Sequence, residues 1–234
     1  MSEGEWGPDA ENWVRWARTP GHDAYWFYRD AFFDRLLPPA GRRTLEIGCG
    51  EGRVARDLAA RGHWVAGVDT SHALLRHARM EDEVSGFALA DSAALPFPDG
   101  CFDLAVAYNA LQVVRDMSAT VREAARVLDA DGRLAICVSH PVTDLGRFAS
   151  DDRAAPFTLR PRYFENERVE DTVERDGLAM TFRGWTYSLE DYAVALQDAG
   201  LRIEAMREPR PSGSDRLYER RQHVPMFLLI LAGK

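Results

Sequence analysis

Cysteine is scarce in this sequence, and the few that occur are not arranged for cross-linking. The chain of 234 residues contains three cysteines, Cys49, Cys101 and Cys137, which lie far apart in apolar or glycine-rich surroundings. Their odd number and their spacing fit neither a disulfide framework nor a zinc site. We therefore predict a protein of the reducing cytoplasm and expect no metal site.

The sequence also lacks a long apolar run and a dense basic stretch. No apolar segment approaches the ~20 residues needed to cross a bilayer, and the N-terminus has no basic flank followed by an apolar core. The formal net charge of -8 disfavours phosphate backbones, and the one basic stretch, 216–221, is interrupted by uncharged and acidic residues. We expect no membrane and no nucleic-acid partner, and either a monomer or a homodimer.

From residue 43 onward, short apolar runs alternate regularly with amphipathic ones. This alternation is typical of strands joined by crossover helices into a parallel sheet. The Pro-, Gly- and Arg-rich segment 209–221 shows no helical periodicity, so the apolar run 225–232 should return antiparallel. The predicted fold is α/β, a Rossmann-like three-layer sandwich with a mostly parallel seven-stranded sheet and an antiparallel last strand. The six strands expected before it are 43–47, 64–68, 86–89, 102–107, 133–138 and 201–207.

Capping residues predict where the connecting helices begin. Segment 53–61 carries an apolar face between the first two strands. Ser71 and Ser118 are predicted to cap the next two helices, and Ser188 with Asp191 is predicted to start the fourth.

Two aromatic regions lie outside this alternation. Residues 1–40 are predicted to be helical, whereas 141–187 are expected to form an irregular insertion. Their aromatic content argues against disorder, and long insertions in a compact domain are usually functional. We expect one domain over 1–234. It comprises a helical cap (1–40), a cofactor-binding core (41–140), the insertion over the active site (141–187), and a C-terminal helix with an antiparallel strand pair (188–234).

The segment EIGCGEG, from Glu46 to Gly52, lies where the first strand turns into the first crossover helix. Alternating glycines let the backbone bend sharply and let a ligand lie against the main chain. Asp69 ends the second strand, where its carboxylate can accept both hydroxyls of a ribose, and Asp91 follows the third strand, in position for an adenine amino group. Each feature taken alone has a purely structural reading, but together they occupy the ends of three successive strands. They predict a nucleotide-like site.

A nicotinamide-dependent dehydrogenase is the alternative reading of the glycine turn. Its fingerprint places the third glycine three residues after the second. Arg53 occupies that position here. The alternating glycines and the expected reversed strand both disfavour the dehydrogenase.

In these segments the chain resembles the class I S-adenosylmethionine-dependent methyltransferases, in particular the small-molecule branch near the ubiquinone-biosynthesis type. The matching segments are 46–52, 67–71, 90–98 and 102–109. The resemblance implies S-adenosylmethionine as cofactor and methyl transfer to O, N or C of a small, apolar or aromatic metabolite. The alternative from another class is a non-catalytic S-adenosylmethionine-binding or scaffold protein of the same fold.

The resemblance also implies a role for individual residues. The implied cofactor residues are Glu46 and Gly48 at the methionine end, Gly50 and Gly52 in the turn, Asp69 at the ribose, Asp91 and Ser92 at the adenine, Tyr108 and Asn109 near the sulfonium, Tyr28 over the methionine carboxylate, and Cys49 and Thr70 as further contacts. Tyr25 is the alternative to Tyr28 in this role, and aromatic packing explains either residue equally well.

Two histidines are the candidates for a general base. Methyl transfer from a sulfonium depends mainly on positioning, and a base helps when the acceptor is a weak acid. His140 follows the strand 133–138 and precedes Pro141, which favours an extended conformation outside any helix. The alternative is a histidine that hydrogen-bonds nearby backbone. His22, after a Pro-Gly turn, is the second candidate.

The acceptor pocket is expected to be built from the two aromatic regions, although a simple hydrophobic cap is the alternative. Four arginines of the insertion are candidates for recognising a carboxylate on the acceptor, and ordinary surface roles are the alternative. They are Arg147, Arg160, Arg162 and Arg183.

Overall fold

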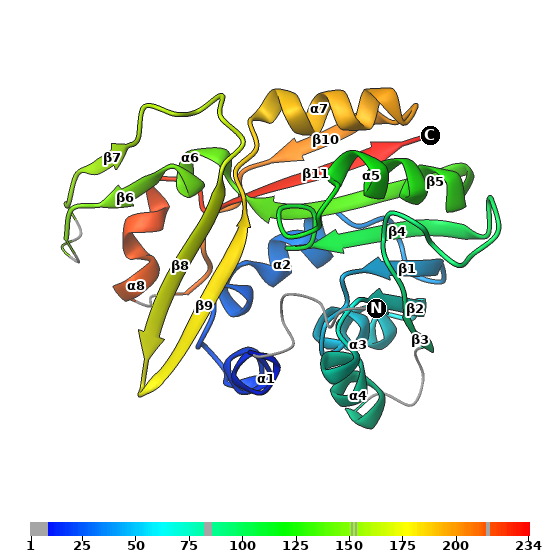
Figure 1. The fold of residues 1–234 in the computed structure, drawn as a ribbon, viewed down its shortest axis with the longest axis horizontal. Coiled ribbons are helices and arrows are strands. Elements are labelled where there is room, and N and C mark those ends of the chain that lie inside the picture. The colour runs from blue at the N-terminus through cyan, green and yellow to red at the C-terminus, as the bar shows by residue number, and fades with distance from the viewer. Residues whose placement is uncertain (1–8, 82–85, 151, 153, 214–215) are drawn as a thin grey trace.

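The computed structural model describes residues 9–81, 86–150, 152, 154–213 and 216–234, which contain a seven-stranded sheet with helices on both faces (Figure 1). Its strands are β1 (Arg43–Ile47), β2 (Trp64–Asp69), β3 (Gly86–Leu89), β4 (Phe102–Tyr108), β5 (Leu128–Ser139), β10 (Arg202–Arg207) and β11 (Phe227–Gly233). They lie in the order β10-β11-β5-β4-β1-β2-β3. β11 is antiparallel to both of its neighbours, whereas the other neighbouring pairs are parallel. The predicted sheet with its antiparallel last strand is confirmed.

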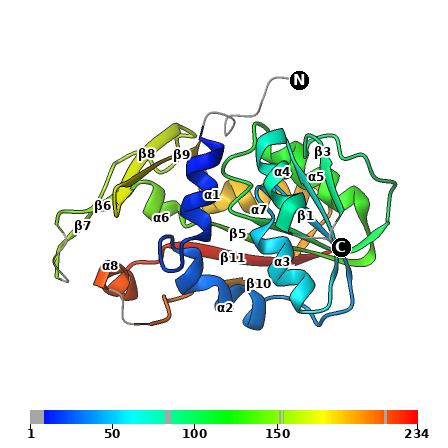
Figure 2. The ribbon, with the colours of Figure 1, turned by 90° about the horizontal axis from the view of Figure 1, so that it is seen from below.

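Helices cover the two faces of this sheet and complete the three layers (Figure 2). They are α1 (Ala10–Arg18), α2 (Tyr25–Arg35), α3 (Arg53–Ala60), α4 (His72–Glu81), α5 (Met117–Val127), α6 (Pro141–Asp144), α7 (Leu189–Asp198) and α8 (Arg216–Glu219). Buried side chains of α5 and α7 pack with the sheet into one core cluster, and those of α2 and α3 form a second cluster. None of these helices is long and apolar enough to span a membrane.

Most of the predicted helix starts are correct. Ser188 forms a capping box with Asp191 at the start of α7, and the Ser71 hydroxyl accepts the Leu74 N–H in α4. The cap predicted at Ser118 is wrong, because α5 begins after Asp116, whose carboxylate accepts the N–H of Ala119 at 2.8 Å. Asp is as good an N-cap as Ser, and the Asp116 backbone is extended as a cap requires.

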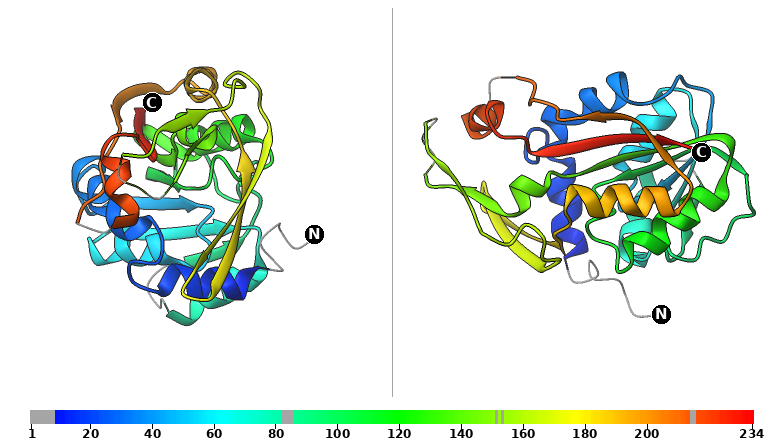
Figure 3. Two further views of the ribbon diagram at one scale, coloured as in Figure 1. Left: turned by 90° about the vertical axis from the view of Figure 1, so that its left-hand side faces the viewer. Right: turned by 90° about the horizontal axis from the view of Figure 1, so that it is seen from above.

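The insertion is not irregular, contrary to expectation. After α6 it forms two hairpins, β6 (Gly146–Phe148) with β7 (Phe157–Leu159), and β8 (Arg168–Arg175) with β9 (Leu178–Trp185) (Figure 3). The turn of the longer hairpin is Asp176-Gly177, with φ of 51° and 75°. Asp-Gly between two strands is a strong hairpin signal because both residues tolerate positive φ. The segment 209–221 also contains a short helix, α8, followed by a 3-10 turn over Arg220–Gln222.

The expected N-terminal helices are present as α1 and α2, whereas Trp6 lies outside the described residues. α1 lies between α4 and the strand β9 of the long hairpin, and contacts both of them (Figure 2). The rings of Trp13 and Trp16 meet Phe182 of β9 edge to face, with centroids 6.2 and 5.9 Å apart. The two aromatic regions of the sequence therefore pack against each other.

Candidate functional site

The carboxyl ends of β1 to β5 lie at one edge of the sheet, as Figure 1 shows by their arrowheads. The turn 48–52 follows β1, Asp69 ends β2, and Asp91 lies just beyond β3. Asn109 follows β4 and His140 follows β5. The fold thus gathers the three predicted motifs and one of the two histidines along a single edge.

The glycine turn adopts left-handed backbone conformations at alternate residues. Gly48, Gly50 and Gly52 have φ of 69°, 54° and 81°, values that glycine adopts without strain. A Cβ on Gly48 would lie 2.8 Å from the Cβ of Ala110, so this position also excludes a side chain by space. The Gly48 N–H donates to the Val68 carbonyl at 2.9 Å, which fixes the turn to the end of β2.

Cys49 is part of this turn, and its side chain is buried beneath the backbone. Its Sγ would be 2.9 Å from a Cβ on Gly67, so the thiol fills the space that this glycine leaves open. Burial raises the pKa of the thiol well above its usual value. Cys49 therefore contributes packing beneath the turn.

The carboxylate of Asp69 joins the turn to the helix α4. One oxygen accepts the N–H of Gly50 and the other accepts the N–H of Ser71, each at 2.8 Å. Burial raises the pKa of Asp69, and these backbone donors oppose the rise. A carboxylate has about four lone-pair positions. The positions that its backbone donors leave open fit the paired hydroxyls of a ribose.

Glu46 is a buried acid whose Oε2 has no hydrogen-bond partner among the described residues. Burial, followed by the charges of Glu51 and Asp69, raises its pKa well above the usual value. A buried acceptor without a partner is costly unless a ligand supplies the missing donor. An ammonium group such as that of S-adenosylmethionine supplies one. The residues present therefore fit this cofactor.

A buried ion-pair cluster, which the sequence analysis did not predict, connects α1 to the turn. The Glu51 carboxylate is buried and lies 2.9 Å from both Arg18 of α1 and Arg56 of α3. Arg18 is 33 positions from Glu51 in the chain. No local pattern in the sequence connects residues at that separation.

Arg53 makes a second connection to the N-terminal helices. Its guanidinium donates to the Asp23 carboxylate at 2.8 Å and to the Ala17 carbonyl at 3.1 Å. It also lies 4.0 Å from the ring centroid of Tyr25. The residue that disfavoured a dehydrogenase in the sequence thus holds α1 and α2 over the start of α3.

On the adenine side, the predicted residues differ in exposure. Thr70 and Asp91 are exposed, and one Asp91 oxygen accepts the N–H of Ala93 at 2.9 Å. Ser92 is buried with its hydroxyl 2.8 Å from that of Thr120 in α5. Asp91 is therefore open to a ligand, whereas Ser92 connects the loop to a helix.

On the sulfonium side, Asn109 has φ of 53°, a conformation that only a few per cent of non-glycine residues adopt. Its N–H donates to the Cys137 carbonyl at 2.7 Å, which holds the strained residue in place. Strain of this kind often marks functional sites. Tyr108 is buried in the core, with its ring centroid 5.4 Å from that of Tyr25.

Tyr28 lies farther along the same edge, beside β11. Its ring packs edge to face on Phe227 at 4.9 Å and on Tyr218 at 6.3 Å. The hydroxyl is buried and has no partner among the described residues. Its predicted contact with the methionine carboxylate stays a prediction, and packing accounts for the position of the ring.

His140 is buried and caps the one-turn helix α6. Its Nδ1 accepts the N–H of Val142 at 3.1 Å, so in the neutral ring the proton is on Nε2. Nε2 lies 2.9 Å from Glu208 Oε1, without the alignment of a hydrogen bond. Burial lowers the pKa of His140, and the Glu208 charge opposes this. These contacts favour the backbone-bonding alternative, and the base role stays a prediction.

His22 is not brought beside His140. It is buried at the tip of the long hairpin, with Nε2 3.2 Å from the Arg175 carbonyl and Nδ1 3.9 Å from Asp176. Its ring also meets that of Trp16, with centroids 4.6 Å apart. A base role for His22 stays a prediction, and its contacts describe a residue that joins the hairpin to the N-terminal helices.

The four arginines expected to recognise a carboxylate do not form one group. Arg162 pairs with Glu167, and Arg183 pairs with Asp9 and Glu170 at 2.7 and 3.0 Å. Arg147 and Arg160 are exposed.

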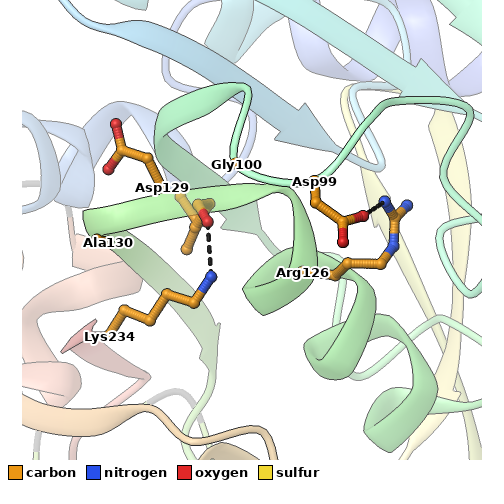
Figure 4. A pocket seen from close by; sticks show the side chains of 7 residues that line it. Asp99, Gly100, Arg126, Asp129, Ala130 and Lys234 are labelled. Atoms are coloured by element: carbon orange, nitrogen blue, oxygen red, sulfur yellow. Dashed lines mark hydrogen bonds and ion pairs between the residues drawn. The ribbon is translucent and has the colours of Figure 1, made fainter.

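A surface hollow of about 580 Å³ lies at the opposite edge of the sheet, near the amino ends of β4 and β5 (Figure 4). Its charged groups are already paired, since Arg126 binds Asp99 at 2.7 Å and Lys234 donates to the Leu128 carbonyl at 2.8 Å. The glycine turn lies at the other edge of the sheet. In the part of the chain that the structure describes, no three His, Cys, Asp or Glu side chains are grouped to bind a metal ion.

Comparison with known proteins agrees with this arrangement. The family model described as a methyltransferase domain matches residues 45–136. The chain is 30% identical over 207 residues to 27-O-demethylrifamycin SV methyltransferase of Amycolatopsis mediterranei, covering 80% of this chain and 68% of the relative. It is 32% identical over 171 residues to demethylmenaquinone methyltransferase of Tropheryma whipplei, covering 67% of this chain and 70% of the relative. A crystal structure of an S-adenosylmethionine-dependent methyltransferase from Mesorhizobium loti superposes with a TM-score of 0.73 at 25% identity, covering 91% of this chain and 98% of that one.

Proposed function

Because the chain belongs to the S-adenosylmethionine-dependent methyltransferase family, we propose that it methylates an O, N or C atom of a small, apolar or aromatic metabolite. The observation that carries the proposal is the pairing of Asp69 with the Gly50 N–H beside Glu46, whose Oε2 has no partner among the described residues. Together they offer acceptors for a ribose diol and for an ammonium group at one edge of the sheet. S-adenosylmethionine supplies an activated methyl group when bound.

The chain contributes mainly positioning to this reaction. Glu46 holds the amino group of the cofactor, Asp69 holds its ribose, and the backbone of Gly50 and Gly52 lies beneath it. Fixing donor and acceptor in line replaces an encounter in solution, and such positioning reaches effective molarities of ~10⁵ M or more. No covalent group on the protein is needed for the transfer.

The N-terminal helices and the insertion cover this edge and exclude water from it. Arg18 and Arg53 attach α1 to the turn and to α3. The hairpin β8–β9 is fixed next to Asn109, because the Trp185 N–H donates to the Gln112 carbonyl at 2.7 Å. Exclusion of water strengthens the electrostatic contacts within the site.

Calorimetry with purified protein tests the cofactor site directly. We expect S-adenosylmethionine and S-adenosylhomocysteine to bind, and Asp69→Ala to weaken both by at least about tenfold, a loss of roughly 1.4 kcal/mol. Undiminished binding by a folded Asp69→Ala variant contradicts the site.

Turnover separates an enzyme from a protein that only binds the cofactor. Cell extract incubated with the protein and S-adenosylmethionine is analysed by untargeted mass spectrometry. We expect a metabolite whose mass gains one methylene, and no such product with Asp69→Ala. Cofactor binding without any product supports the scaffold alternative.

A further inference from the structure

Arg221 carries a positive charge near the carboxyl end of β5, and the hydrogen-bond partner of its guanidinium among the described residues is a neutral hydroxyl. Its Nη1 donates to the hydroxyl of Thr143 at 2.9 Å. That hydroxyl donates its own proton to the Pro225 carbonyl at 2.5 Å, so toward Arg221 it acts only as an acceptor. No carboxylate of the described residues lies within ion-pair distance of Arg221. One neutral oxygen therefore holds a guanidinium whose remaining donors have no partner among the described residues.

The surroundings of Arg221 only partly offset the cost of burying its charge. Burial lowers the pKa of Arg221. Tyr28 opposes this shift, and the adjacent Arg220 adds to it. Asp144 is the acid near it, and burial raises the pKa of that carboxyl to about 7, so near neutral pH it carries only about half a negative charge. A half-buried cation in such surroundings binds an anion favourably, because the anion removes the unfavourable field.

Aromatic rings form the walls around this cation. The guanidinium lies 5.1 Å from the ring centroid of Phe148 and 5.9 Å from that of Phe157, which face each other across the hairpin β6–β7. Burial raises the pKa of Tyr28, and the nearby charge of Arg221 opposes the rise. The buried Tyr28 hydroxyl has no partner among the described residues. The groups around the cation thus offer an apolar wall and one further hydrogen-bonding hydroxyl.

This cluster lies at the edge of the sheet where the acceptor is expected. Thr143 belongs to α6, which directly follows His140 at the end of β5, and Tyr28 packs on Phe227 at the start of β11. β5 is next to β4, whose end carries the strained Asn109. The cation is therefore on the β5 side of the site, away from the adenine side at β2 and β3.

We propose that Arg221 is the specificity-determining residue of the acceptor site and binds a carboxylate on a flat, largely apolar methyl acceptor. The inference rests on the proposed methyltransferase function and adds the substrate class to it. A guanidinium offers a planar pair of N–H donors that matches a carboxylate, and the rings of Phe148 and Phe157 hold an apolar body beside it. Arg221 does not take part in bond breaking, so it acts by binding and orienting the acceptor.

The experiment compares hydroxylated aromatic carboxylates with their uncharged carboxamides. The affinity of each compound is measured with protein saturated with S-adenosylhomocysteine. For the pairs that turn over with S-adenosylmethionine, KM and kcat are also measured. The variants are Arg221→Gln, Arg221→Lys as the charge-retaining change, and Arg202→Gln as a matched loss of one exposed arginine on β10. Thermal unfolding of each variant reports folding.

With the unmodified chain, we expect the acids to bind about tenfold more tightly than the amides. In the turnover assay, this preference should appear as a lower KM for the acids, with similar kcat values for acid and amide. Arg221→Gln should reduce this preference to within about twofold, Arg221→Lys should retain part of it, and Arg202→Gln should leave it unchanged. The affinity for S-adenosylhomocysteine should be the same in all four proteins.

Four results overturn the inference. Three of them are no preference for acids in the unmodified chain, no acid bound at all, and a preference that survives in Arg221→Gln. The fourth is an equal loss for acid and amide in Arg221→Gln, because that pattern reports structural damage. The proposed function fails separately, through absence of cofactor binding. A protein that binds cofactor and methylates acid and amide equally retains the function and loses only this inference.

Discussion

The Asp69 carboxylate accepts the backbone N–H of Gly50 at 2.8 Å and thereby joins the end of β2 to the glycine turn after β1. Two segments 19 positions apart thus form one ligand-binding surface. The same carboxylate also accepts the Ser71 N–H, so the start of α4 is fixed to this surface. The ribose acceptor is therefore held in place before any ligand binds.

Replacing Glu46 by Gln is predicted to weaken S-adenosylmethionine binding by about tenfold, because a neutral amide attracts an ammonium group less than a carboxylate does. Burial raises the pKa of Glu46, whereas a bound ammonium group favours its charged form, so cofactor binding is coupled to loss of a proton from this carboxyl. The affinity of the unmodified chain should therefore rise with pH, and that of Glu46→Gln should not. Calorimetry from pH 6 to 9 measures both, with the exposed Glu190→Gln as control. Parallel pH profiles for the two proteins contradict the assignment.

Replacing Glu51 by Gln is predicted to destabilise the fold by about 2 kcal/mol, because it leaves Arg18 and Arg56 without their buried partner. The loss should be largest at α1. Urea unfolding measures the free energy, and hydrogen exchange reports which amides lose protection. The exposed Glu190→Gln serves as the matched control here too, and a free energy equal to that of the unmodified chain would show that the cluster contributes nothing.

His140→Asn and His140→Ala separate the two roles of this histidine. Asn is a good N-cap and retains an acceptor for the Val142 N–H, whereas Ala removes it at a cost of about 1 kcal/mol. If capping is the role, Asn retains the methylation rate within about threefold and Ala lowers the stability. If His140 is the base, both variants lose the rate between pH 6 and 9. Because Nδ1 already accepts a hydrogen bond, we expect the first outcome.

The pKa of His140 adds a second readout. Burial lowers it below the usual 6.5, so the unfolded chain binds the proton more readily than the folded one. The stability contribution is present above pH 6.5 and is lost as the pH falls through the folded pKa. Relative to the unmodified chain, His140→Asn should therefore gain stability as the pH falls from 7 to 5. A constant difference between the two unfolding free energies contradicts the lowered pKa.

Asp144→Asn is predicted to gain stability relative to the unmodified chain as the pH rises, whereas His140→Asn gains it as the pH falls. Burial raises the pKa of Asp144 from 3.8 to about 7, so the folded chain binds this proton more tightly than the unfolded one. Its stability contribution is full below pH 3.8 and is lost as the pH rises to 7. The variant, which stays neutral, should gain stability relative to the unmodified chain over that interval. Urea midpoints at pH 4.5 and 8 measure the change, and a relative loss at pH 8 would indicate an ionised Asp144 paired with Arg221.

Local sequence was sufficient to predict the sheet and the edge of it that carries the glycine turn and Asp69. Strand and helix periodicities repeat within a few residues, and the carboxyl ends of parallel strands must share one edge, so Gly50 and Asp69 could be placed together in advance. The Ser118 cap failed because Asp116, two residues earlier, is an equally good cap. The hairpin β8–β9 was not predicted, although Asp176-Gly177 signals it, because β8 is mostly exposed and has no apolar face to mark it as a strand.

The amino-acid sequence by itself determined a Rossmann-like sheet with a reversed last strand and a glycine turn facing two carboxylates, since periodicity, turn residues and strand ends are local properties. The tertiary structure alone decided which charges meet. Arg18 pairs with Glu51, His140 lies beside Glu208, and the Arg221 guanidinium donates to the neutral hydroxyl of Thr143. Such contacts join segments far apart in the chain, and their energies depend on burial and on direction, which no local pattern encodes.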